Sequence, residues 1–300
     1  MATRDDTGLL EGTVDMHAHC GPSLITRTAD GYECARDAAQ VRMDGIVLKE
    51  HFLPTVYGVP YIDRLLPDSY EGTAIGSVVL NYCNGGFNPF MVQTALDFGA
   101  KVVWAPTMDA KHHASRSGGL GKQFGIDRSD APEYRGKDGL YALTESGELK
   151  DDVRICLDKI IEADAVFAVG HLSFEEMRAI AEYTADRGHD RVVIDHPNYY
   201  VTDLNREQQQ ALIDLGAYVN FPFCAIAPRA HWLSTTELYE NIRDLGVDNC
   251  IVTSDLGQVG NPDHVDGFRM FGDLLLEEGL SEAEFRTLAA TNPKYLLDMA

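Results

Sequence analysis

Short apolar runs, rich in β-branched residues, recur along the whole chain. Most of them are continuously apolar rather than alternating, which is typical of strands that are buried on both faces, as in a parallel sheet. The pattern predicts eight strands, at 13–19, 45–51, 74–82, 101–107, 165–171, 191–196, 217–223 and 250–255.

Helical segments lie between these runs. One of them, 87–100, has Pro89 near its first turn and Gly99 after its last. Capping boxes formed by Ser173 with Glu176, and by Ser281 with Glu284, indicate two further helix starts. The remaining helices are predicted at 151–164, 206–216 and 235–246. Strands that alternate with helices over this length predict an α/β fold, a (β/α)8 TIM barrel, with a doubly wound open sheet as the alternative.

A long polar segment, 108–150, follows the fourth predicted strand. It is rich in glycine, serine and charge, and its end predicts a small hairpin about the turn Glu145-Ser146-Gly147. Long loops in compact domains commonly cover binding sites. No internal repeat or linker is evident, so we expect one domain over residues 1–300 with this loop inserted after strand 4.

Composition narrows the choice of partners and compartment. The chain is 45% hydrophobic and 24% charged, an ordinary globular balance, but its formal net charge is −22. A charge of this sign argues against nucleic acid and against anionic membrane surfaces. Six cysteines without a CxxC pair, and a beginning without an apolar signal segment, predict a cytoplasmic protein with reduced thiols. We expect a homo-oligomer that acts on a small molecule.

Potential metal ligands stand where predicted strands end. His17 and His19 close the first strand with one residue between them, so both imidazoles point to the same face. The ends of later strands carry Lys49, His51, His171, His196 and Asp255. In a (β/α)8 barrel these ends surround one mouth, where active sites lie. The nitrogen and oxygen ligands predict a site for one or two divalent ions, Zn or Mn first.

This ordered set resembles the amidohydrolase superfamily of metal-dependent hydrolases. The likeness rests on an HxH on strand 1, single histidines on strands 5 and 6, an Asp on strand 8, and the closing "TNPKYLLDM", which is similar to that superfamily's NPA-x-LLGL segment. Over the whole chain, it implies that His17, His19, His171 and His196 bind metal. It makes Asp255 a ligand that also takes a proton from the attacking water. The implied substrate has an amide, a cyclic amide or a lactone.

The chain departs from that family pattern on strand 4. Binuclear members usually take a bridging carboxylated Lys or a Glu from this strand, whereas "KVVWAPTMD" ends without either. Lys49 lies on strand 2 instead, on the same face as His51, a further candidate ligand. Three interpretations of Lys49 stay open: a displaced carbamylated bridge, a cationic substrate anchor, or a barrel residue with its charge at the mouth.

Other functions fit parts of the pattern. The HxH and His51 also resemble the PHP phosphoesterases, but "VTSDLGQ" lacks the DxH motif that those proteins carry near the C-terminus. A deaminase or a decarboxylase would fit the same scaffold. The chain could also be a non-catalytic metal-binding barrel, although a pure binding site has no need of a proton acceptor such as Asp255.

Three residues are candidates for substrate contact. His112 and His113 lie in the long loop, where the alternative is a solvated pair. Arg229, just after strand 7, could bind a substrate carboxylate through both its guanidinium nitrogens, or could be an ordinary surface arginine. His189 and His264 are expected at the surface.

Overall fold

The computed structural model describes residues 7–67, 72–123 and 126–299. The chain divides into two compact units. Unit 1 comprises Met1–Glu50, Thr55–Gly76 and Phe221–Ala300, and unit 2 comprises His51–Pro54 and Ser77–Asn220. The predicted single domain stays a prediction, and each unit is described by itself.

A small parallel sheet forms the centre of unit 1. Its strands are β1 (Val14–His19), β2 (Gly45–Lys49) and β3 (Thr73–Ile75), paired in that order. β11 (Cys250–Thr253) ends beside β1, where Ala18 and Leu256 form a parallel bridge. Every residue of β1, β2 and β11 is buried, as the continuous apolar runs predict.

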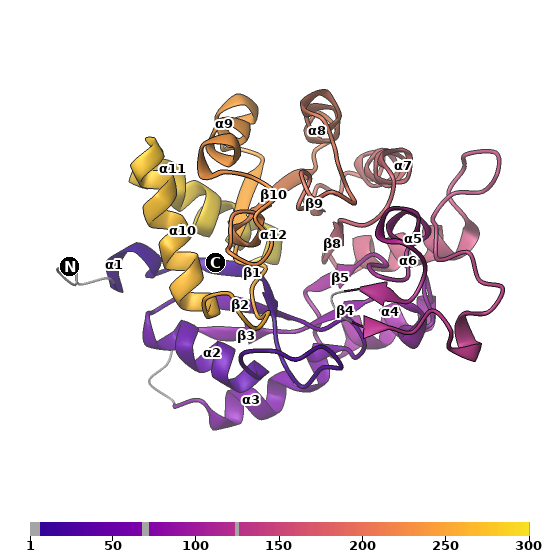
Figure 1. The fold of residues 1–300 in the computed structure, drawn as a ribbon, viewed down its shortest axis with the longest axis horizontal. Helices are drawn as coiled ribbons and strands as arrows, with labels where there is room; N and C mark the ends of the chain where they lie inside the picture. Colours follow the sequence, from indigo (N-terminus) through magenta and orange to yellow (C-terminus); the bar gives the residue numbers. More distant parts are fainter. Residues whose placement is uncertain (1–6, 68–71, 124–125, 300) are drawn as a thin grey trace. The chain divides into compact units, whose positions relative to one another are not determined.

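Helices surround this sheet. They are α1 (Thr7–Leu10), α2 (Gly31–Gln40), α3 (Val59–Leu65), α9 (Thr235–Leu245), α10 (His264–Glu278), α11 (Glu282–Arg286) and α12 (Asn292–Leu297), with a π-helical turn at Thr287–Thr291. Figure 1 shows α2 and α3 along one side of the β1–β3 sheet, which both helices contact. The capping box of Ser281 and Glu284 is confirmed. α2 begins with an unpredicted one, formed by Asp30 and Glu33.

Unit 2 is built on parallel strands with helices between them. The strands run in the order β10-β9-β8-β5-β4, with bounds β4 (Ser77–Val79), β5 (Val102–Trp104), β8 (Val166–Val169), β9 (Val192–Asp195) and β10 (Tyr218–Pro222), the last of which ends in unit 1. The helices are α4 (Pro89–Asp97), α5 (Lys111–Ser117), α6 (Asp151–Glu162), α7 (Phe174–Ala185) and α8 (Arg206–Ile213). The capping box of Ser173 and Glu176 is confirmed. The third predicted strand, in contrast, breaks at Gly76 into β3 and β4.

The long segment after β5 has local structure. It holds α5, the short antiparallel pair β6 (Lys122–Gln123) and β7 (Ile126–Asp127), and the predicted hairpin, where Leu143 and Leu149 form an antiparallel bridge. The amide of Ala142 donates to Glu176 Oε1 at 2.6 Å, which ties the hairpin to α7.

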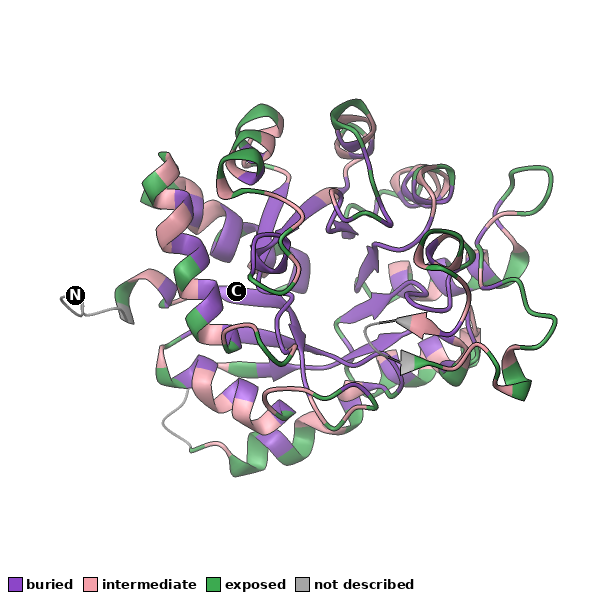
Figure 2. Ribbon diagram, in the orientation of Figure 1, coloured by how far each residue is buried: buried purple, intermediate pink, exposed green. Residues whose placement is uncertain are grey.

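Burial confirms some predictions and corrects two. All six cysteines are free thiols, as predicted. His189 and His264 are buried, so their predicted surface positions are wrong: the first faces inward beside Asp164, and the second turns from the start of α10 into unit 1. Figure 2 shows buried residues along the strands and exposed residues on the outer sides of the helices. No helix in the described part of the chain is both long and apolar enough to cross a membrane.

Candidate metal centre

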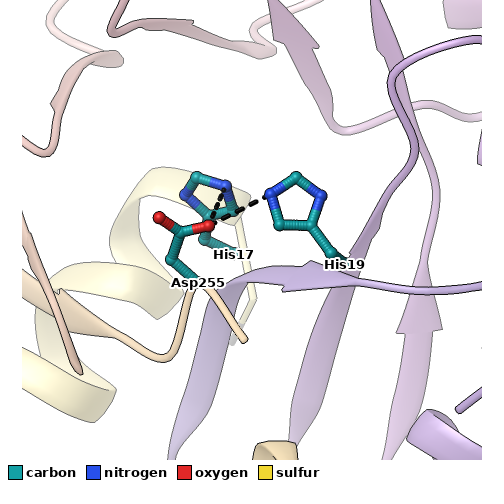
Figure 3. A group of neighbouring side chains, drawn as sticks. All are labelled: His17, His19 and Asp255. Atoms are coloured by element: carbon teal, nitrogen blue, oxygen red, sulfur yellow. Dashed lines mark ion pairs between the residues drawn. The ribbon is translucent and has the colours of Figure 1, made fainter. Parts of the chain in front are cut away.

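Three buried side chains of unit 1 meet at the end of β1. Asp255 Oδ1 lies 3.2 Å from His17 Nε2 and 3.0 Å from His19 Nε2. Figure 3 shows one carboxylate oxygen facing both rings, which rise from β1. The three ligand atoms lie within 4.8 Å of one another, a spacing that suits a single metal ion. The predicted convergence of His17, His19 and Asp255 is therefore present in the structure.

The backbone after β11 brings Asp255 to this position. Its φ of +48° is rare for a residue with a side chain, and such strain is common at functional sites. The Asp255 amide donates to the His17 carbonyl at 2.8 Å, and the His19 amide donates to the Leu256 carbonyl at 2.9 Å. A Cβ at Gly257 would stand 2.0 Å from the His19 carbonyl oxygen, so only glycine allows this close approach.

Two buried side chains, Asp15 and His264, hold the same backbone through hydrogen bonds. Asp15 shares the face of His17 and His19, and its Oδ1 accepts hydrogen bonds from the amides of His17 at 3.1 Å and Ser254 at 3.0 Å. Burial raises the pKa of Asp15, although these hydrogen bonds oppose the rise. His264 Nε2 lies 2.9 Å from the His19 carbonyl, to which it donates, and burial lowers the pKa of His264.

Lys49 ends β2 and points into the same group. Its Nζ lies 3.0 Å from His17 Nε2, and the side chain is 1% exposed. An ammonium group only donates hydrogen bonds. A protonated Lys49 therefore occupies the lone pair that His17 would give to a metal ion.

Arg27 is a member of this neighbourhood that the pattern did not predict. Its Nη2 lies 3.3 Å from His19 Nδ1, and its buried Nε has no hydrogen-bond partner in the structure. Within the described ranges, no carboxylate comes within ion-pair distance of its guanidinium. Burial lowers the pKa of Arg27, while the charges of Asp255 and Glu50 oppose this. No sequence signal marks it, because it lies in an irregular segment after β1.

A second group of histidines lies in unit 2. His171 follows β8, His196 follows β9, and His113 comes from α5. His113 Nδ1 and His171 Nδ1 are 2.7 Å apart, and the ring centroids of His171 and His196 are 4.8 Å apart. His196 Nδ1 lies 3.3 Å from the hydroxyl of Thr202. This group contains two of the predicted ligands and one residue predicted to contact substrate.

Local packing holds these rings together. A Cβ at Gly170 would stand 2.6 Å from His196 Cε1, so the glycine before His171 leaves the space that the ring fills. His196 itself has a φ of +34°, the second strained residue with a candidate ligand side chain. Burial, with smaller effects of His196 and His112, lowers the pKa of His113 to about 4, so this imidazole is neutral at pH 7.

The other predicted residues have contacts of their own. His51 is buried, with Nδ1 3.0 Å from the Thr107 hydroxyl. His112 Nε2 donates to the Val201 carbonyl at 2.8 Å. Arg229 is exposed, and its guanidinium donates to the carbonyl of Val259. The roles assigned to these residues, and the meeting of all strand ends at one mouth, stay predictions.

Several solved structures have a similar fold. An amidohydrolase from Pseudomonas aeruginosa has a TM-score of 0.63 at 11% identity, with 98% of each chain covered. A probable 2-pyrone-4,6-dicarboxylic acid hydrolase from Acinetobacter baumannii, with citric acid bound, has a TM-score of 0.56 at 14% identity, covering 96% of this chain and 99% of that one. A phosphotriesterase homology protein from Escherichia coli, complexed with phosphate, has a TM-score of 0.57 at 14% identity, with the same coverage.

The likeness spans nearly the whole chain and confirms the predicted fold class, an α/β barrel. Two of these neighbours are named as hydrolases. The chain belongs to DUF6282, a family of unknown function whose model matches residues 12–220. The matched stretch includes every predicted histidine ligand, whereas Asp255 lies beyond it. No curated protein matches the chain.

The geometry of unit 1 generates a prediction about metal content. Changing His17→Ala and His19→Ala together removes two of three converging ligand atoms, so we expect the bound Zn²⁺ or Mn²⁺ to fall by at least one ion per chain. Elemental analysis of desalted, metal-loaded protein measures this, and circular dichroism confirms folding. The exposed His231→Ala is the control. Wild-type stoichiometry in the double variant would place the metal elsewhere.

Proposed function

We propose that the protein is a metal-dependent hydrolase that cleaves an amide, a cyclic amide or a lactone of a small molecule. The observation that carries this proposal is the buried group of His17, His19 and Asp255. Its two imidazole nitrogens and one carboxylate oxygen are the donor set that suits Zn or Mn. Proteins of the same fold that are named as amidohydrolases and as a dicarboxylic acid hydrolase support the assignment.

Asp255 has the geometry of a general base. A divalent ion, when bound, supplies a water of lowered pKa and polarises the carbonyl that is attacked. One carboxylate oxygen of Asp255 faces the two imidazoles, and Figure 3 shows the other turned away from both rings. This second oxygen can accept the proton of the attacking water and return it to the leaving nitrogen or oxygen. The strained backbone holds the carboxylate in place for both transfers.

Lys49 fits this function as a carbamate. A protonated Lys49 and a divalent ion would compete for the lone pair of His17 Nε2. They would also repel each other strongly, because both are positively charged and the site is buried. Addition of CO₂ to the neutral amine forms the N–C bond, releases one proton and replaces the positive charge with a carboxylate. The carbamate would then offer oxygen ligands where the ammonium blocked a nitrogen.

Arg27 indicates the substrate class. A half-buried guanidinium without a carboxylate partner is a ready site for an anion, because arginine binds carboxylate through two parallel hydrogen bonds. Its position beside His19 would place that anion next to the reacting group. We therefore propose that the substrate carries a carboxylate in addition to the bond that is cleaved.

The test of the proposed function is the variant Asp255→Asn. With an amide, cyclic amide and lactone panel, we expect turnover to fall by about 10²-fold or more, since the asparagine cannot accept the proton. Metal content is measured in parallel, because Asp255 is also a candidate ligand. Asp266→Asn, whose carboxylate pairs with Arg269 at the surface of α10, is the control.

The same panel contains phosphomonoesters and phosphodiesters. Near-normal turnover by metal-loaded Asp255→Asn would remove the general-base role. Efficient phosphate release that is lost in His51→Ala would reject amide and lactone hydrolysis in favour of the PHP-like alternative.

A second test concerns Lys49. We expect Zn²⁺ loading of the wild type to rise with added bicarbonate, and that of Lys49→Arg to be indifferent to it, because arginine forms no stable carbamate. Protein loaded with ¹³C-bicarbonate should show a carbamate carbon by NMR, absent in the variant. Loading that ignores bicarbonate, with no such signal, would leave the substrate-anchor and barrel-residue interpretations.

A third test separates two arginines. Arg27→Met should raise KM for a carboxylate-bearing substrate by about 10- to 100-fold, the cost of hydrogen bonds to a charged group, with little effect on a neutral analogue. Arg229→Met, at the residue that the pattern favoured, should change neither. Equal effects of Arg27→Met on both substrates would exclude anion recognition.

A further inference from the structure

The fourth predicted strand lacks the lysine or glutamate that would bridge two metal ions. β5 ends at Trp104, and the residues that follow it up to α5 include neither lysine nor glutamate. The first residue after β5 whose side-chain nitrogen contacts a predicted metal ligand is His113, on α5. Its partner is His171. It was predicted as a substrate contact or a solvated residue, whereas the structure buries it completely.

We propose that His113 is a metal ligand, which completes a three-imidazole site with His171 and His196 in unit 2. This inference rests on the proposed metal-dependent function and deepens it. A divalent ion of the Zn²⁺ or Co²⁺ class is the expected occupant, because three histidines are a common donor set for such ions.

The contact between His113 and His171 is the first support. Two Nδ1 atoms at 2.7 Å can share only one proton, so one nitrogen donates and the lone pair of the other accepts. An ion in place of that proton would use both lone pairs at once, with a modest widening of the separation.

The surroundings of His113 are the second support. Its Nε2 is buried and has no hydrogen-bond partner in the structure, so the polar contact of the ring is made by Nδ1, which faces His171. Its ring centroid lies 4.8 Å from that of His171, which lies equally close to that of His196. Three buried imidazoles thus lie together, with His171 next to each of the other two.

The anchoring of α5 is the third support. His112 Nε2 donates to the carbonyl of Val201 at 2.8 Å, and Arg116 Nε donates to that of Tyr200 at 2.9 Å. The amide of Lys111 donates to the Leu140 carbonyl at 2.7 Å. Side chains before and after His113 thus fix the helix to the segment that follows His196. The long loop thereby places His113 against His171, while the adjacent His112 anchors the helix.

The experiment isolates this site in the variant with His17→Ala and His19→Ala. After loading with Co²⁺, we expect one ion per chain, with three imidazole nitrogens by X-ray absorption. Adding His113→Gln should weaken Co²⁺ binding by about 10²-fold or more, measured by calorimetry. Adding His231→Gln instead, at an exposed histidine, should leave both readouts unchanged. Thermal unfolding of the metal-free variants checks that they fold.

The outcomes separate this inference from the proposed function. Two imidazoles by X-ray absorption, or Co²⁺ affinity unchanged by His113→Gln, would overturn the role of His113 alone. The same holds if the wild type binds Co²⁺ and the variant with His17→Ala and His19→Ala binds none. A wild-type chain that binds no divalent ion would overturn both the inference and the metal-dependent function.

Discussion

The candidate metal centre of unit 1 depends on the backbone pairing of β1 with residues 254–257. The amide of Asp255 reaches the carbonyl of His17, and the Leu256 carbonyl receives the amide of His19, so carboxylate and imidazoles are fixed on the same two strands. Asp15 secures the pairing by accepting hydrogen bonds from both strands at once. The left-handed backbone at Asp255 is strained on its own, and it persists because these bonds over-determine it.

Charge decides what this centre can bind. Lys49 and Arg27 both approach its imidazoles, so a divalent ion would enter a site that already holds two positive groups. The overall charge of −22 does little to offset them, because solvent screens surface carboxylates while buried pairs interact strongly. Conversion of Lys49 to a carbamate removes one positive charge, and an anionic substrate uses the other. Both proposals therefore reduce the repulsion between a divalent ion and the positive groups around it.

The sequence predicts the strands and their ligands better than the helices and the contacts. Continuous apolar runs identify the buried strands, and the alternation of β1 places His17 and His19 on one face. The hydrophobic pattern does not reveal α2, because the buried face of this helix is mostly alanine, with Gly31 and Cys34. α10 is hidden by two interior glycines, Gly267 and Gly272, which packing requires. The contacts of Arg27, His113 and His264 are found only in the structure, because no strand or helix periodicity relates these residues to His19 or His171.

A shared fold does not choose the reaction. Proteins with this fold include an amidohydrolase, a probable dicarboxylic acid hydrolase and a phosphotriesterase homologue, so the scaffold serves different bonds. In our proposal, the histidines at the strand ends supply a place for a divalent ion. We therefore expect specificity to come from residues that touch those histidines without belonging to the common pattern. In this chain they are Lys49 beside His17, Arg27 beside His19 and His113 beside His171, and each changes the charge or the ligand count at the histidine it contacts.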